Sequence, residues 1–208
     1  RGKFNNLIVD FSAYRNSYKD FISTEIVVAP YYGVVGEAAP TGLPLPVGAL
    51  AIANGDYTAY SAYTNSRAGI TSYGASIGLS TKVFGNFDLS GNYTYAKMDE
   101  DKDFPDFNTN FNTPEHKFKA SFGNTALFEN FGFNVAYRFS DDYYWEASFG
   151  NGVVEEFHTV DAQINYSVPS IKSTFKAGAT NLLGTEYNTA FGTGNIGSMY
   201  FLSWTINN

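Results

Sequence analysis

The sequence contains no cysteine and only two histidines, His116 and His158. Without cysteine there are no disulfides, thiolate nucleophiles or Cys-based metal sites, and only two imidazoles remain as metal ligands. Basic residues are also scarce, because 13 Lys and Arg stand against 20 Asp and Glu, for a net charge of −7. Phosphate binding needs clustered Lys and Arg, so we expect no nucleic-acid partner, and the sequence indicates no metal or cofactor.

Signals of targeting and of helical membrane spans are missing as well. No start Met or apolar leader opens the chain, and its first residues, Arg1-Gly2-Lys3-Phe4, resemble the interior of a longer polypeptide. The one long uncharged stretch, Ala38 to Gly55, contains Pro40, Pro44 and Pro46. Prolines at this density exclude an ordinary transmembrane helix, so we interpret the stretch as a loop.

Aromatic residues and glycines are abundant, with 19 Phe, 16 Tyr and 20 Gly against 7 Pro. This composition favours many strands joined by turns. Apolar and polar residues alternate with period two in about eight segments. In the clearest segment Val160, Ala162, Ile164, Tyr166 and Val168 form one face, and Thr159, Asp161, Gln163, Asn165 and Ser167 form the other.

The other alternating segments share this pattern and restart after each turn signal. They cover Leu7 to Tyr14, Tyr73 to Ser80, Phe87 to Tyr95, Lys117 to Phe122, Phe131 to Ser140, Phe175 to Thr180 and Tyr200 to Asn207. We therefore predict an all-β fold.

The lengths of the connections distinguish a membrane barrel from a soluble sandwich, because outer-membrane barrels alternate short periplasmic turns with long external loops. Short turns are predicted near Gly85-Asn86, Glu129-Asn130 and Pro169-Ser170, and long irregular stretches at about Ala29 to Thr58, Asp99 to Thr113, Phe149 to Phe157 and Gly192 to Gly197. This alternation predicts a transmembrane antiparallel β-barrel, since strands in hydrocarbon must pair all their backbone groups.

Two barrel sizes fit the pattern. About eight strands can close on themselves, as a self-contained small barrel with a structural or adhesive role. The inward residues are mostly small, which favours a wide barrel occluded by another domain. The two models differ at the outermost strands, taken to be Leu7 to Tyr14 and Tyr200 to Ile206: a small barrel would pair Val9 with Leu202.

Three segments of the C-terminal half are similar to one known family: Asn112-Thr113-Pro114-Glu115-His116-Lys117, Tyr144-Trp145-Glu146-Ala147-Ser148-Phe149-Gly150 and Asn181-Leu182-Leu183-Gly184-Thr185-Glu186-Tyr187. They resemble TonB-dependent outer-membrane receptors of the Bacteroidetes type, and Tyr18 to Ile22 resembles the barrel sequence of that family. The chain departs from the family at its end, Ile206-Asn207-Asn208, where family members commonly finish on an aromatic residue.

The resemblance implies that residues 1–208 are the C-terminal part of a receptor barrel, about the last eight of twenty-two strands. The plug domain and earlier strands would lie outside this chain. It further implies the outer membrane of a Gram-negative bacterium, lipid and the TonB complex as partners, and import of a bulky nutrient such as a glycan, a peptide or a metal chelate. A surface lipoprotein is a further expected partner. No particular substrate follows from the sequence.

The candidate site residues are aromatic. Trp145 and Trp204 are expected at the membrane interface, where amphipathic rings gather. Tyr143 and Tyr144 are candidate ligand contacts, and so are Tyr31 and Tyr32 in the longest outer loop. Packing of that loop on itself is the alternative for Tyr31 and Tyr32.

Two patterns in the sequence could indicate an enzyme active site or a metal site. His158, Asp161 and His116 could suggest a hydrolase, but Asp161 lies on the opposite strand face from His158 and no Ser or Cys nucleophile accompanies them. The spacing of Asp99, Asp101 and Asp103 begins like a calcium loop but lacks its sixth-position Gly and its twelfth-position Glu. We therefore expect neither an enzyme nor a metal site.

Overall fold

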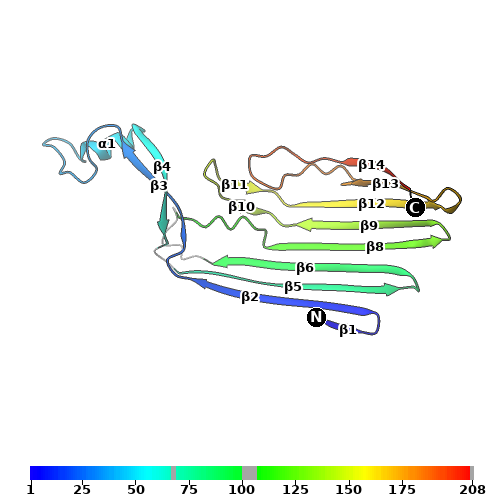
Figure 1. The fold of residues 1–208 in the computed structure, drawn as a ribbon. Coiled ribbons are helices and arrows are strands. Elements are labelled where there is room, and N and C mark those ends of the chain that lie inside the picture. The colour runs from blue at the N-terminus through cyan, green and yellow to red at the C-terminus, as the bar shows by residue number, and fades with distance from the viewer. Residues whose placement is uncertain (67–68, 100–106, 207–208) are drawn as a thin grey trace. The chain divides into compact units, whose positions relative to one another are not determined.

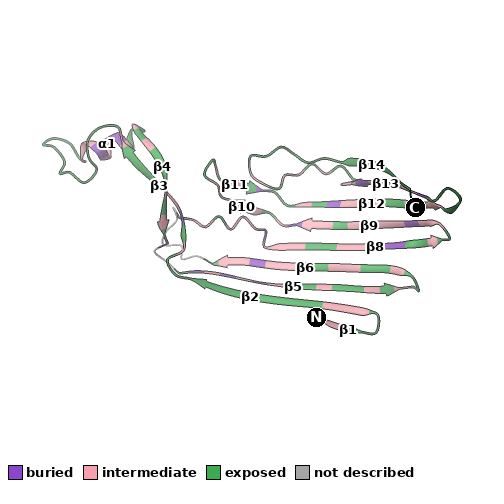
Figure 2. Ribbon diagram, viewed as in Figure 1, coloured by how far each residue is buried: buried purple, intermediate pink, exposed green. Residues whose placement is uncertain are grey.

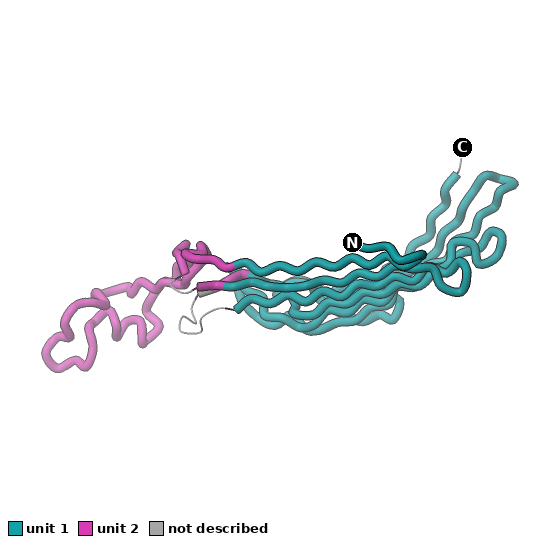
Figure 3. The backbone as a smooth tube through the Cα atoms, turned by 90° about the horizontal axis from the view of Figure 1, so that it is seen from below, with its two compact units in different colours: residues 1–16, 71–99, 111–208 teal, residues 17–70, 100–110 magenta. Residues whose placement is uncertain are grey.

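The computed structural model describes residues 1–66, 69–99 and 107–206 (Figure 1). Two compact units make up the chain: unit 1 comprises residues 1–16, 71–99 and 111–208, and unit 2 comprises residues 17–70 and 100–110 (Figure 3). Asp101 and Asp103 of the calcium-like pattern lie outside the described residues.

Unit 1 is built on one antiparallel sheet, to which nine strands contribute in the order β1-β2-β5-β6-β8-β9-β12-β13-β14. The strands are β1 (Gly2–Phe4), β2 (Leu7–Tyr18), β5 (Ile70–Val83), β6 (Phe87–Asp99), β8 (His116–Phe128), β9 (Phe131–Ser140), β12 (Phe157–Val168), β13 (Ser173–Thr180) and β14 (Met199–Ile206). Seven of the eight alternating segments lie within one of these strands, and the eighth coincides with β14 as far as Ile206, so the all-β prediction is confirmed.

Short turns join the strands of this sheet at one end. Phe84 and Gly85, between β5 and β6, have φ angles of 47° and 90°, and glycine reaches the second of these without steric cost. Phe128 pairs directly with Phe131, which closes the turn between β8 and β9. A 3₁₀ turn, Pro169–Ile171, joins β12 to β13. The three predicted short turns are confirmed.

The long connections lie at the opposite end of the sheet (Figure 1). In unit 1 the β9–β12 connection contains a hairpin, β10 (Tyr143–Trp145) paired with β11 (Gly152–Val154). Residues 181–198 connect β13 to β14. In unit 1 short and long connections therefore alternate as predicted, while residues 100–106 of the predicted stretch Asp99 to Thr113 lie outside the described residues.

The register sorts side chains into two faces, because successive residues of a strand point to opposite sides. Ile164, for example, is opposite Phe133 on one neighbour and Ala177 on the other. The apolar face carries such residues along seven strands: Tyr73, Ile77, Leu79, Leu89, Tyr93, Phe118, Phe122, Phe133, Val135, Tyr137, Ile164, Tyr166, Phe175, Leu202 and Trp204.

The polar face is lined by hydroxyl, amide and charged groups. Hydrogen bonds cross the strands there from Ser12 Oγ to Ser76 Oγ at 2.7 Å and from Ser90 Oγ to Ser121 Oγ at 2.7 Å. Burial is low on both faces, because the sheet has no second layer over it (Figure 2). Apolar-face residues such as Ile164 and Leu202 remain 49% and 81% exposed, which suits contact with lipid rather than water.

The sheet is open at β1 and β14. We expected Leu7 to Tyr14 to be an outermost strand, and this is wrong, because Gly2–Phe4 adds β1 outside it. Val9 pairs with Gly2, and Leu202 pairs with Ala177. Among the described strands, then, no ladder joins β2 to β14, and the contact expected of a self-closed small barrel is not formed.

Unit 2 contains structure that the sequence analysis missed. Strands β3 (Ile22–Pro30) and β4 (Tyr57–Asn65) form a hairpin, and β7 (Phe107–Asn108) pairs with β3. The interpretation of Ala38 to Gly55 as a loop is wrong in part, because Val47–Ala53 forms helix α1. Pro46 stands at its N-cap, where a missing N–H costs nothing.

Gly48 explains how α1 packs. A β carbon there would lie 2.7 Å from the Val34 carbonyl carbon, so only glycine permits this approach. Within the described residues no helix is long and apolar enough to cross a membrane.

The two faces generate a paired prediction. We expect Ile164→Arg to reduce the folded protein recovered in the outer membrane, because a cation near the bilayer midplane costs about 2–4 kcal/mol. Asn165→Arg, on the polar face of the same strand, should leave recovery unchanged. Heat-modifiable migration on gels measures the folded fraction. Equal losses for both variants would mean that the polar face is a dry core.

Candidate functional site

The long-connection end of unit 1 holds a packed group of loops, here called the cap: residues 111–115, 141–157 and 181–198. Three of the most deeply buried side chains lie in or beside it, namely Val154, Asn181 and Thr159, whereas most of the sheet is half-buried or exposed. The three sequence segments that resemble the receptor family all pass through the cap.

Asn112 ties two of these loops together. Its side-chain oxygen accepts the Glu146 N–H at 2.7 Å, and its side-chain amide donates to the Glu146 carbonyl oxygen at 2.8 Å. Asn112 has a φ of 43°, a conformation that asparagine adopts more readily than most residues. The side chain therefore replaces a strand partner for the first residue after β10.

Asn181 organises the third loop. Its side-chain amide donates to the Thr185 carbonyl oxygen at 2.6 Å, and its side-chain oxygen accepts the Thr185 N–H at 3.1 Å. Ser198 Oγ donates to the Asn181 carbonyl oxygen at 2.6 Å, which joins the two ends of the loop. With 2% of its surface exposed, Asn181 is a buried polar residue whose hydrogen bonds are satisfied inside the fold.

Asp161 connects this loop to the sheet. Asp161 Oδ1 accepts the Asn181 N–H at 2.8 Å, and Oδ2 lies 2.9 Å from the Arg138 guanidinium. One carboxylate therefore binds a strand neighbour and the first residue of the loop. These contacts argue against the hydrolase pattern, because the Asp161 carboxylate is already bound to Arg138 and Asn181. His158 lies on the opposite face of β12.

Aromatic contacts pack the loops on one another. Phe157 and Tyr187 stack with ring centroids 4.2 Å apart. Phe191 lies against Gly152 so closely that a β carbon there would overlap its ring. Tyr143 donates its hydroxyl to the Thr189 carbonyl oxygen at 2.8 Å. The cap is therefore held from several sides and presents a preformed surface.

Two candidate ligand residues, Tyr143 and Tyr144, lie in the cap on β10. The Tyr143 hydroxyl is engaged with Thr189, and burial raises its pKa. Tyr144 is 57% exposed and is the better placed of the two to meet a ligand. Trp145 lies beside Tyr143, with ring centroids 6.4 Å apart, and its indole N–H is buried without a partner among the described residues.

The other two candidate tyrosines belong to unit 2. Tyr31 is 66% exposed, and its N–H donates to the Asp56 carbonyl oxygen at 3.0 Å. Tyr32 donates its hydroxyl to Asp56 Oδ2 at 2.6 Å, and this hydrogen bond raises the pKa of Tyr32. Packing of the loop on itself therefore accounts for the Tyr32 hydroxyl, while the Tyr31 ring stays available.

Trp204 lies at the other end of the sheet from Trp145. It stacks on Phe175 with centroids 6.0 Å apart, and its indole N–H donates to Ser173 Oγ at 3.0 Å. Ser173 follows the short turn, so Trp204 marks the short-turn end of the apolar face.

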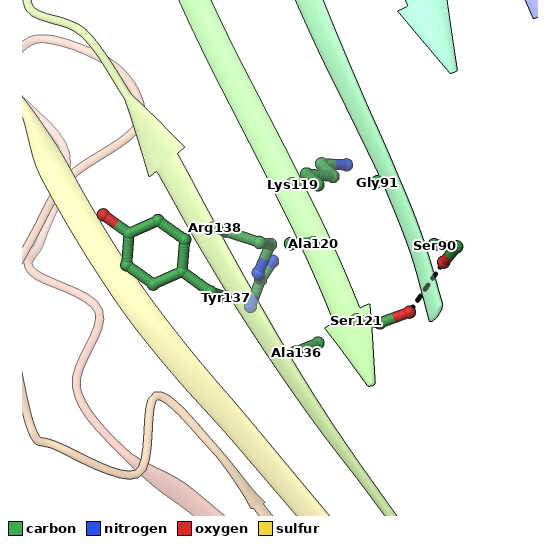
Figure 4. Close-up of a pocket in the computed structure, with 8 residues that line it drawn as sticks. All are labelled: Ser90, Gly91, Lys119, Ala120, Ser121, Ala136, Tyr137 and Arg138. Atoms are coloured by element: carbon green, nitrogen blue, oxygen red, sulfur yellow. Dashed lines mark hydrogen bonds between the residues drawn. The ribbon is translucent and has the colours of Figure 1, made fainter. Parts of the chain in front are cut away.

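The polar face holds a feature that we did not predict. Lys119 on β8 is directly opposite Arg138 on β9. With Ser90 and Ser121 they line a shallow hollow of about 280 Å³ (Figure 4). The sequence contained one signal for this feature, namely two lysines two residues apart in an alternating segment, Lys117 and Lys119. Among the described residues no group of three or more His, Cys, Asp or Glu side chains is arranged to hold a metal ion.

The Asp161 contacts lead to a test of the cap. We expect Asp161→Ala to raise hydrogen exchange of residues 181–198 about tenfold or more, because a hydrogen bond to a charged group contributes roughly 1.5–3 kcal/mol. Asp161→Asn should have a smaller effect, since it keeps an acceptor. Gln163→Ala, on the same face of β12, is the matched control. Equal exchange in the Ala variants at 161 and 163 would contradict the role given to Asp161.

Solved structures of transporters share this fold. The chain superposes on "Copper transporter OprC" with a TM-score of 0.60 and 16% identity, over 97% of this chain and 28% of that one. The ferric-catecholate import receptor Fiu from E. coli K12 gives a TM-score of 0.61 and 14% identity, over 96% and 25% of the two chains. The FrpB iron transporter from Neisseria meningitidis gives 0.61 and 13%, over 97% and 29%.

The chain therefore spans between 25% and 29% of the length of these structures. At these identities the likeness concerns the fold. None of the curated proteins compared with the chain matches it. A family model described as "TonB dependent receptor-like, beta-barrel" matches residues 1–182. Because that match covers most of the sequence, the chain belongs to the TonB-dependent receptor β-barrel family, a family of outer-membrane receptors of Gram-negative bacteria and not of enzymes.

Proposed function

We propose that residues 1–208 are the C-terminal part of a plugged, twenty-two-stranded importer of the Bacteroidetes type, which takes up a bulky nutrient with energy delivered through TonB. The family match over residues 1–182 carries this proposal. The open edges at β1 and β14 support it, since strands in lipid need partners that the rest of a larger barrel would supply. The three cap segments support the Bacteroidetes assignment.

In this proposal the cap is the ligand-facing part of the chain. Its loops are tied by Asn112 and Asn181, so a ligand would meet an ordered surface and little binding energy would be lost to ordering it. Tyr144 offers an exposed ring for contact, and Tyr31 offers another in unit 2. Trp145 and Trp204 take the two membrane interfaces. A surface lipoprotein is the partner proposed for the outer loops.

Among glycans, peptides and metal chelates, metal chelates are the first substrate class to examine. The solved structures that share this fold include a copper transporter, an iron transporter and a ferric-catecholate import receptor. Those relatives share only the fold with this chain, so all three classes belong in the experiment.

The orientation can be tested with introduced cysteines, because the natural sequence has none. We expect a membrane-impermeant thiol reagent to label Pro44→Cys and Val153→Cys in intact cells. Asn86→Cys and Ser170→Cys, in the short turns, should react only after lysis. Val153 is chosen beside Gly152 because a side chain at Gly152 would overlap Phe191. Labelling of the short-turn positions in intact cells would invert the proposed topology.

Transport is tested with the whole receptor gene in cells. We expect uptake of at least one radiolabelled probe, among ferric and cupric chelates, oligopeptides and oligosaccharides, to require both the receptor and TonB. Tyr144→Ala should lower uptake severalfold by removing an exposed contact, with folded receptor unchanged. Tyr166→Ala, an exposed tyrosine of the apolar face, is the control. Uptake that persists without TonB would refute energy-coupled import.

A further inference from the structure

Positive charge is concentrated on the polar face of the four strands β8, β9, β12 and β13. Lys117, Lys119, Arg138 and Lys176 lie on this face, and Asp161 is its one carboxylate among the described residues of these strands. This excess runs against the composition of the chain, whose net charge is −7. The acidic residues are therefore placed elsewhere, largely in connections.

The register brings three of these cations together. Lys119 pairs with Arg138, and Lys117 precedes it by two residues on the same face, opposite Ser140. Asp161 is already bound to Arg138 and to the Asn181 N–H. No ion pair within the described parts of the chain involves Lys117, Lys119 or Lys176.

The Lys119 neighbourhood has room for an acceptor. The hollow in Figure 4 opens between β6, β8 and β9, with Lys119 and Arg138 at its sides and the bonded Ser90 and Ser121 hydroxyls beside them. Arg138 Nε is buried and has no hydrogen-bond partner within the described residues. A carboxylate in this hollow would accept from Lys119 and from hydroxyl donors, which are the groups that bind carboxylates well.

We propose that Lys117, Lys119 and Arg138 form a docking surface for carboxylates of the plug, a face of which must be acidic where it meets β8 and β9. This inference rests on the proposed function, because it requires a plug in the lumen. Covering Lys117 and Lys119 with uncharged polypeptide would leave two cations desolvated and without an anionic partner, which is strongly unfavourable. Opposed carboxylates remove that cost and fix the rotational position of the plug.

A resident polypeptide fits these lysines better than a transported anion. The lysines have no anionic partner within these strands, so polypeptide that covers them in the resting receptor must supply one at all times, whereas cargo would supply it only during passage. The chain spans between 25% and 29% of the three structures compared above, so the remainder of a receptor offers ample polypeptide for this role.

The test uses the purified whole receptor in planar bilayers with urea, where release of the plug from the barrel would be measured as the opening of a channel. We expect Lys119→Glu to raise the fraction of open channels at a fixed urea concentration about tenfold, in the range of measured coupling for close charge pairs. Lys117→Glu combined with Lys119→Glu should raise it further. High salt should increase opening of the natural receptor and have less effect on the variants.

Matched controls separate charge from folding. Lys119→Arg keeps the charge and should behave as the natural receptor. Lys172→Glu reverses a charge in the exposed turn between β12 and β13 and should change nothing. Heat-modifiable migration confirms that each barrel is folded. Zero-length carbodiimide cross-linking followed by peptide mass spectrometry should join Lys117 or Lys119 to a carboxylate of the plug.

Equal urea sensitivity of the Glu variants at 119 and 172 would overturn the inference while leaving import untouched. So would reduced uptake by Lys119→Glu with unchanged plug release, since this result would assign the lysines to anionic cargo. A natural receptor that shows no urea-induced channel would have no removable plug, and the proposed function would fail together with the inference.

Discussion

Backbone hydrogen bonding inside hydrocarbon is the constraint on which this structure depends. A peptide group in lipid has no water to bond, so each strand must be paired along its whole crossing. The sheet of unit 1 meets this requirement in its interior, where β12 is paired with β9 over Phe157 to Tyr166 and with β13 over Ala162 to Val168. Because the paired backbone satisfies this requirement, the side chains need only divide into an apolar face and a polar face. This explains why the fold has almost no buried core.

The backbone of the cap is hydrogen-bonded in a different way from that of the sheet. Its backbone groups lie beyond the ladders, and asparagine side chains take the place of neighbouring strands at Glu146 and Thr185. Asp161 then attaches the cap to the wall, because one carboxylate serves both Arg138 and Asn181. Asp161 therefore couples the last loop to the sheet, together with the Leu182 N–H, which donates to the Val160 carbonyl oxygen at 2.7 Å.

Period-two alternation made the strands of unit 1 predictable, because a sheet with lipid on one face repeats the same contrast in every strand. The sequence did not predict β1, since three residues are too few to show a period. It did not predict β3, where Ile26, Val27 and Val28 are consecutive apolar residues, or α1, which begins just after the last proline of its stretch. The hydrogen bond from the Asn181 N–H to Asp161 joins a loop residue to a strand residue twenty positions earlier, so no local sequence pattern announces it.

The ends of the last loop are fixed independently of its tip. Ser198 binds the Asn181 carbonyl oxygen, and Tyr187 and Ile196 form a bridge further out. Residues 188–195 therefore lie beyond a closed stem, and within them Thr189 and Phe191 contact the β10–β11 hairpin. Sequence change at the other positions of that tip can alter the surface of the cap while the stem stays closed. Such a stem lets recognition diverge among related receptors while the membrane-spanning wall stays the same.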